Sequence, residues 1–114
     1  MHKDWSALTA SLAEQMGKTR QGIPDTAKAF GMLAAAATAA GALDGKTKEL
    51  IALAIGIAVR CDGCIGFHAK AALKQKATRH EVLETIGMAI YMGGGPSYIY
   101  GAQALEAFDQ FSAG

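Results

Sequence analysis

The chain has 114 residues and no run of proline, serine or like charge that would mark a linker, so we expect one domain spanning residues 1–114. Eleven Lys and Arg residues oppose ten Asp and Glu residues without forming a basic cluster, which argues against a nucleic-acid partner. The charged N-terminus lacks the apolar run of a signal peptide, and residues 93–96 (Gly-Gly-Gly-Pro) interrupt the longest charge-free stretch, so we expect a cytoplasmic protein that does not enter a membrane.

The first half of the chain is expected to be helical, because no segment alternates apolar and polar residues as a half-buried strand does. Apolar residues at steps of three and four predict a first amphipathic helix, namely Trp5, Leu8, Leu12 and Met16. We expect a break at residues 17–25, after which Pro24 fits the first turn of an alanine-rich second helix that reaches residue 43. A third helix begins at Asp44, and its long apolar run predicts burial on most sides.

The second half of the chain is expected to contain three more helices, which gives an all-α fold of about six. The fourth helix begins near Asp62, because the glycine that follows disfavours continuation from upstream. Before the fifth helix, Thr78 and Glu81 have the Thr-x-x-Glu spacing of a capping box. The glycines and proline at 93–96 end it, and a sixth helix runs from about Ser97 to Phe111. The expected apolar face of this last helix comprises Tyr98, Ala102, Leu105 and Phe108.

Small and apolar residues predict how the helices pack. Gly56, Gly66 and Gly87 lie inside predicted helices, where each costs about 1 kcal/mol relative to alanine, so we expect neighbouring backbones to approach closely there. Apolar residues make up 51% of the chain. A chain of this length buries only about 60–70% of its surface on its own, so we expect a homo-oligomer.

Both cysteines and one histidine lie within eight positions, at Cys61, Cys64 and His68. On a helix these positions would share an arc of about 60°. A cysteine reacts as the thiolate, which the start of a helix stabilises, and His68, one turn beyond Cys64, could accept the thiol proton. The cluster therefore predicts redox chemistry, with His68 acting on Cys64; which cysteine reacts first stays open.

A histidine base works best when a carboxylate orients it, and Glu49 on the preceding helix is the candidate. Other interpretations remain: Glu49 as a solvated helix residue, and the cysteines as small core residues. A zinc site is a further alternative, with Cys61, Cys64 and His68 as ligands. Structural zinc sites have four ligands, and no second Cys-x-x-Cys or histidine pair exists to complete this one, so we expect neither a metal nor another cofactor.

Taken together, Glu49, Cys61-x-x-Cys64 and His68, with the helical stretch 42–59, resemble the alkylhydroperoxidase AhpD-like branch of the carboxymuconolactone decarboxylase superfamily, over about residues 25–110. The resemblance implies an all-α fold, assembly into trimers or hexamers, and Glu49, Cys61, Cys64 and His68 as the catalytic set, with Glu49 and His68 relaying protons. It also implies a cofactor-independent peroxidase of antioxidant defence. Such an enzyme reduces a hydroperoxide and is itself reduced by a lipoyl-bearing or thioredoxin-like dithiol protein.

Two alternative functions and two departures accompany this resemblance. The decarboxylases that name the superfamily lack the cysteine pair, so a lactone enzyme is the second choice and a non-catalytic oligomeric or metal-binding module the third. Gly63 stands where some members carry a histidine that adds to the relay. Lys76 stands where relatives often carry glycine, so it must either adopt a left-handed conformation or end its helix differently.

Overall fold

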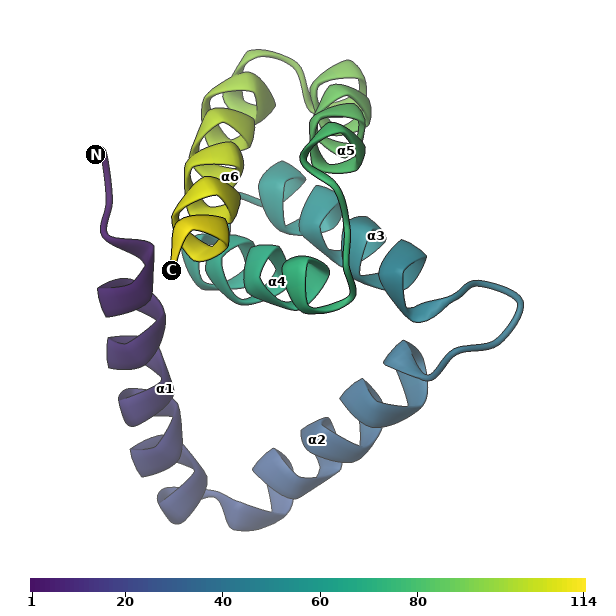
Figure 1. Cartoon of the computed structure of the whole chain (residues 1–114). Helices are drawn as coiled ribbons and strands as arrows, with labels where there is room; N and C mark the ends of the chain where they lie inside the picture. Colours follow the sequence, from purple (N-terminus) through teal and green to yellow (C-terminus); the bar gives the residue numbers. More distant parts are fainter.

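The structure is a computed structural model that describes residues 1–114, and it consists of six α-helices without any strand (Figure 1). The prediction of an all-α fold is confirmed. In chain order the helices are α1 (Trp5–Gly22), α2 (Pro24–Thr38), α3 (Gly45–Ala58), α4 (Asp62–Lys74), α5 (Arg79–Gly93) and α6 (Gly95–Ala113). None of them combines the length and the apolar character that crossing a membrane requires.

Local sequence determines where several helices begin. The side chain of Asp44 accepts a hydrogen bond from the backbone N–H of Thr47, which has no partner within α3. The predicted capping box of α5 is confirmed, since Thr78 accepts from the N–H of Glu81 while the Glu81 carboxylate accepts from the N–H of Thr78. Pro24 stands in the first turn of α2, as predicted.

Three predicted boundaries differ from the structure. The expected break at residues 17–25 is confirmed but is shorter than predicted, because α1 continues to Gly22 and Ile23 alone separates α1 from α2. The Lys, Arg and Gln residues of that stretch favour helix, and isolated glycines cost too little to end one. Helix α2 ends at Thr38, short of residue 43. Helix α6 begins earlier than predicted, because Gly94 makes the turn at φ 75° and Pro96 fits the first helical turn.

The core lies among the last four helices. Helix α3 packs against α4 and α5, and α6 packs against the same two helices (Figure 1). Helix α1 adds Trp5 to this unit at one end. The buried core comprises Trp5, Leu53, Ile57, Ile65, Ala69, Ala72, Ala77, Val82, Ile86, Ala89, Ala104, Ala107 and Phe108. Helices α1 and α2 form the two sides of an open V beside this unit (Figure 1).

Helix α2 buries none of its residues, although it carries Phe30, Met32 and Leu33. It contacts only α1 and α3. As a result one face of α3 is uncovered, and Ile51 and Ile55 are exposed. The prediction that α3 is buried on most sides is therefore wrong for the single chain.

The predicted apolar face of α6 is also wrong in part. Tyr98 and Ala102 are exposed, whereas their neighbours Ser97 and Gly101 are buried. The reason is a close approach, because a Cβ placed on Gly101 would lie 2.6 Å from a methyl carbon of Ile86 on α5. Small residues rather than large ones therefore define the buried face at the start of α6.

The glycines predicted to allow close packing fall into two groups. A Cβ on Gly66 would lie 2.7 Å from the Cγ2 atom of Thr9, so α1 reaches α4 only because this residue lacks a side chain. A Cβ on Gly87 would meet open space, so the expectation of a close approach there is wrong within the chain. The third glycine, Gly56, lies beside the cysteine pair.

Candidate active site

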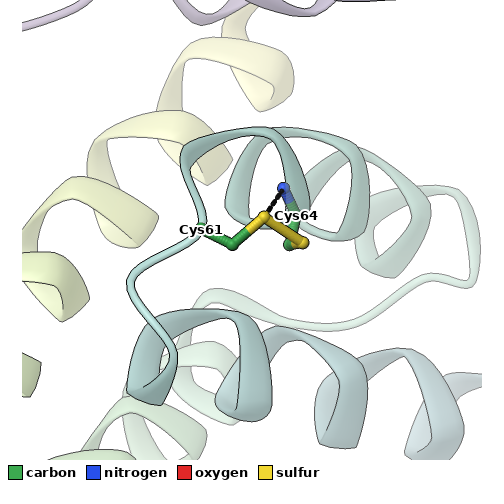
Figure 2. Close-up of a disulfide and its surroundings, with 2 residues drawn as sticks. All are labelled: Cys61 and Cys64. Carbon is green, nitrogen blue, oxygen red and sulfur yellow. Dashed lines mark hydrogen bonds between the residues drawn. A yellow bond between two sulfur atoms is a disulfide. The ribbon is translucent and has the colours of Figure 1, made fainter. Parts of the chain in front are cut away.

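Cys61 and Cys64 form a disulfide at the start of α4 (Figure 2). Their Cα atoms are 5.2 Å apart, an ordinary separation for a disulfide. The expectation that Cys61 shares a helical face with Cys64 and His68 is wrong, because Cys61 precedes the helix as its N-cap with an extended backbone. Its Sγ accepts a hydrogen bond from the backbone N–H of Cys64 at 3.1 Å (Figure 2). The disulfide nevertheless keeps both sulfur atoms at the N-terminus of α4.

A tight reversal after α3 places Cys61 in this position. Arg60 has φ 60°, in the left-handed region that costs a residue with a side chain roughly 1–2 kcal/mol. The N–H of Cys61 donates to the carbonyl of Gly56 at 3.0 Å, and the N–H of Arg60 donates to that of Ile57 at 3.1 Å. These two bonds are the Schellman arrangement in which helices commonly end.

Gly56 brings the end of α3 against the cysteine pair. A Cβ placed on Gly56 would lie 3.0 Å from the Cβ of Cys64, which is tighter than ordinary side-chain contacts. The close approach predicted for this glycine is confirmed. One side of Cys64 is therefore covered by the backbone of α3, while the residue as a whole is half-buried.

The same reversal motif ends α4. Lys76 has φ 66°, and the N–H of Ala77 donates to the carbonyl of Ala72 at 3.0 Å. Of the two alternatives for Lys76, the left-handed conformation is the one adopted. A residue other than glycine in this conformation thus stands at each end of the helix that carries the cysteines and His68.

Glu49 and His68 lie in direct contact between α3 and α4. The Nδ1 atom of His68 is 2.8 Å from Oε2 of Glu49. The Glu49 side chain is only 12% exposed, whereas the His68 side chain is 34% exposed. With its proton on Nδ1, His68 donates to the carboxylate and keeps Nε2 free to accept another proton. Since His68 follows Cys64 by one turn, this pair could move a proton to or from that sulfur.

A second charged contact, which no sequence pattern predicted, lies at the start of α4. Lys3 Nζ is 2.6 Å from Oδ2 of Asp62 and 2.7 Å from Oε1 of Gln103. Asp62 stands between the two cysteines in the chain and in the first turn of α4. Lys3 is 59 positions from Asp62, a separation over which no local pattern predicts contact.

The segment that carries Lys3 is fixed to α6. The Glu106 carboxylate accepts hydrogen bonds from the backbone N–H groups of His2 and Lys3 and from the indole N–H of Trp5. These bonds, that from His2 first, hold the pKa of Glu106 below its ordinary value of 4.5, although partial burial opposes them. Gln110 completes the anchor, since its amide accepts from the N–H of Trp5 and donates to the carbonyl of Lys3.

No three side chains of His, Cys, Asp or Glu lie close enough together to hold a metal ion. The remaining helical histidine, His80, is 3.5 Å from Glu84 one turn later on α5, and both side chains are largely exposed. This pair resembles the pair of Glu49 and His68 in its residue types but stands away from the cysteines.

Comparison with known proteins places the whole chain in one family. Residues 24–107 match the model of the carboxymuconolactone decarboxylase family. An uncharacterized protein of Cupriavidus necator is 37% identical over 113 residues, which cover 99% of this chain and 100% of the relative. An uncharacterized protein of Haemophilus influenzae is 38% identical over 108 residues, covering 95% and 96% of the two chains.

Solved structures agree with this assignment. The crystal structure of a carboxymuconolactone decarboxylase family protein from Legionella pneumophila, free of ligand, superposes with a TM-score of 0.93 at 55% identity, covering 95% of this chain and 96% of that one. A Thermotoga maritima member, with a suggested part in the antioxidative response, gives a TM-score of 0.73 at 25% identity over 87% and 91% of the chains. The chain belongs to the carboxymuconolactone decarboxylase family.

Proposed function

We propose that this protein is an AhpD-like thiol peroxidase that reduces hydroperoxides through the cysteine pair at the start of α4. The observation that carries the proposal is the contact between Glu49 and His68, 2.8 Å apart, one turn beyond a disulfide-forming Cys-x-x-Cys pair. This arrangement brings together a base, the carboxylate that orients it and two thiols, which are the groups that thiol-based peroxide reduction needs. The suggested antioxidative part of the Thermotoga relative points to the same chemistry.

In the first step, Cys64 attacks the hydroperoxide. His68 accepts the thiol proton at Nε2, and Glu49 stabilises the resulting imidazolium through its contact with Nδ1. The thiolate sulfur bonds to the terminal peroxide oxygen while the O–O bond breaks, giving a sulfenic acid on Cys64. The leaving alkoxide takes a proton from the imidazolium and departs as the alcohol, or as water when the substrate is hydrogen peroxide.

In the second step, Cys61 resolves the sulfenic acid. Its sulfur lies where the backbone N–H of Cys64 and the N-terminus of α4 favour a negative charge. Attack on the sulfur of Cys64 forms the disulfide and releases the sulfenic oxygen as water. A lipoyl-bearing or thioredoxin-like dithiol then reduces the disulfide to two thiols and becomes a disulfide itself. We further propose a cytoplasmic location, since a reducing compartment supplies that dithiol.

Thiol counting tests this function directly. The reduced protein is mixed with one equivalent of cumene hydroperoxide, and free thiols are titrated before and after. We expect the loss of two thiols per chain, their return on treatment with dithiothreitol, and no loss in Cys64→Ser. Unchanged thiols in the native chain would contradict the proposal. Turnover of carboxymuconolactone that survives replacement of both cysteines would instead identify a lactone enzyme.

The roles of the two cysteines are separated by trapping. In Cys61→Ser the sulfenic acid has no resolving partner, so we expect dimedone to label Cys64 after one equivalent of peroxide. In Cys64→Ser we expect no label on Cys61 over the same time. A labelled Cys61 together with an unlabelled Cys64 would reverse the proposed order of attack.

The proton relay has a matched control within the chain. Glu49→Gln and His68→Asn should each slow the loss of thiols by about 10²- to 10⁴-fold, the usual contribution of a positioned acid or base. His80→Asn changes the other helical histidine with a glutamate neighbour and should leave the rate unaltered. Equal effects of His68→Asn and His80→Asn would exclude a specific relay.

We also propose that the protein assembles as a homo-oligomer through α2. A helix of 15 residues is marginal in water without packing, and α2 buries none of its residues within the chain. Its large side chains, Phe30 and Leu33, are 67% and 63% exposed. A second copy that covers α2 would supply the missing packing, in agreement with the trimers or hexamers that the family resemblance implies.

A further inference from the structure

We infer that Lys3 is a positioning residue for the redox site: its ammonium group offsets the charge of Asp62 between the two cysteines and so makes the disulfide easier to reduce. The inference rests on the proposed function only in taking Cys61 and Cys64 as a pair that is oxidised and reduced. It assigns the N-terminal segment, which precedes the family match at residues 24–107, to that site.

The contacts of Lys3 form a defined site rather than a single surface ion pair. Its Nζ atom lies 2.6 Å from Oδ2 of Asp62 and 2.7 Å from Oε1 of Gln103, so two acceptors from different helices fix the ammonium group. The Lys3 side chain is 27% exposed and that of Asp62 is 40% exposed. Partial burial of both partners reduces the screening that makes most surface ion pairs weak.

The backbone around Lys3 is held in place independently of that ion pair. The Glu106 carboxylate accepts from the N–H of Lys3 at 2.9 Å and from the indole of Trp5 at 2.9 Å. Gln110 donates to the carbonyl of Lys3 at 2.6 Å. Trp5 is completely buried, and its ring lies beside the position where Gly66 lacks a Cβ. The ammonium group therefore stands at a fixed place relative to the start of α4.

The chemical consequence follows from the charge that reduction creates. An external dithiol breaks the S–S bond, becomes a disulfide itself, and leaves two protein thiols, of which the more acidic loses its proton. The resulting thiolate lies in the same helical turn as the Asp62 carboxylate, and the two negative charges repel. Lys3 cancels much of that repulsion. Stabilising the thiolate favours the reduced form and makes the disulfide a better oxidant.

An electrostatic role and a purely structural role of the Lys3–Asp62 contact predict different shifts of the redox equilibrium in two single variants. If charge controls the site, Lys3→Met leaves Asp62 unopposed and shifts the equilibrium toward the disulfide, whereas Asp62→Asn leaves the ammonium unopposed and shifts it toward the dithiol. The double variant Lys3→Met/Asp62→Asn restores an equilibrium between disulfide and dithiol close to that of the native chain. If the contact only holds the segment in place, both single variants loosen the same contact and move the equilibrium in the same direction.

The experiment measures the equilibrium of the full chain with mixtures of reduced and oxidised dithiothreitol at neutral pH and low salt, followed by alkylation and mass spectrometry. We expect shifts of about three- to tenfold, opposite in sign for the two single variants, and smaller at high salt. Shifts of the same sign, or none in either variant, would overturn the inference. Lys3→Arg keeps the charge and should stay near the native value.

One further measurement and one feature of the design keep the result interpretable. Trp5 is the only tryptophan, so unchanged fluorescence of each variant verifies that the N-terminal segment stays packed. The redox equilibrium is measured without hydroperoxide, so the measurement is unaffected if the peroxidase proposal fails. Opposite shifts in a protein that does not react with peroxide would support the inference and remove the proposed function, whereas peroxide-dependent thiol loss with unshifted variants would do the reverse.

Discussion

The molecule has two parts, the four-helix unit of α3 to α6 and the arm formed by α1 and α2. Both parts are rich in apolar residues, yet the four-helix unit forms the core whereas most of the arm is exposed. The four-helix unit contains all but one of the buried core residues, and both elements of the candidate relay belong to it. Helix α2 contains no buried residue at all. Apolar composition alone therefore does not separate a core helix from one whose packing partner lies outside the chain.

The residues of the candidate site likewise come from two parts of the molecule. The cysteines, Glu49 and His68 depend on the close packing of α3 against α4, where Gly56 has no side chain. Lys3 comes from the segment before α1, where the N-terminus is anchored to α4 and α6. In the proposed mechanism the four-helix unit thus provides the reacting groups, and the N-terminal segment provides a charge that acts on them.

The largest expected effect concerns the arm. Phe30→Ser/Leu33→Ser should dissociate the proposed oligomer, because each large apolar side chain contributes about 1.5–3 kcal/mol when fully buried. Sedimentation velocity measures the change, with Lys28→Gln on the same helix as the control that keeps the native mass. A native chain that stays monomeric at every concentration would remove the proposed interface.

The next effect concerns the core. Leu53→Ala should lower the free energy of unfolding by about 2–5 kcal/mol, because Leu53 is completely buried in α3. Urea denaturation measures this loss, which should not depend on protein concentration. Leu33→Ala on α2 should instead destabilise in a way that grows weaker as the protein is diluted, since its packing would come from a second copy. The comparison between core and arm fails if the two leucines behave alike.

Two glycines sharpen the comparison, Gly66 at the junction between α1 and α4 and Gly87 on α5, away from that junction. Gly66→Ala should destabilise the fold by about 1–3 kcal/mol, because its Cβ would overlap Thr9 and press on Trp5. Gly87→Ala should stabilise it by roughly 0.5–1 kcal/mol, since alanine favours helix and the added methyl meets open space. Thermal unfolding of the two variants gives the sign of each change in stability, and equal signs would contradict the packing of α1 on α4.

The smallest effect is a dependence on pH at the anchor of the arm. The hydrogen bond from the His2 backbone, followed by those from Lys3 and Trp5, lowers the pKa of Glu106 in the folded chain. A depressed carboxyl pKa contributes stability that is complete above the unfolded value of 4.5 and is lost as pH falls through the lower folded value. Native stability should therefore fall more steeply than that of Glu106→Gln when the solution is acidified below pH 4.5. Chemical denaturation followed by the fluorescence of Trp5 measures both slopes, and parallel slopes would exclude this role for Glu106.

Features encoded by neighbouring residues could be predicted from the sequence. The capping box of Thr78 and Glu81, the place of Pro24 and the start of α4 all depend on residues within one turn, and the structure has them as expected. The contact of Glu49 with His68 spans two helices, but its register follows from one short reversal. The break within residues 17–25 was predicted too long, because weak glycine penalties were outweighed by good helix formers around them.

Contacts that depend on the final packing could not be predicted in this way. Lys3 lies near the N-terminus, Asp62 in the middle of the chain and Gln103 near its C-terminus, and only the position of the N-terminal segment against α4 and α6 brings them together. The position of Cys61 outside the helix depends on the left-handed conformation of Arg60, which no residue preference indicates for arginine. The buried face of α6 likewise depends on Gly101 fitting against Ile86.

The close packing of Gly56 on Cys64 covers the side of this residue that faces α3. Hydroperoxide and dithiol would then both have to reach the cysteine pair from the sides that α3 leaves open, and each reacts with the form of the pair that the other produces. The proposed cycle would consequently follow ping-pong kinetics, in which the alcohol or water formed from the hydroperoxide leaves before the dithiol enters. Double-reciprocal plots at several fixed dithiol concentrations should accordingly give parallel lines.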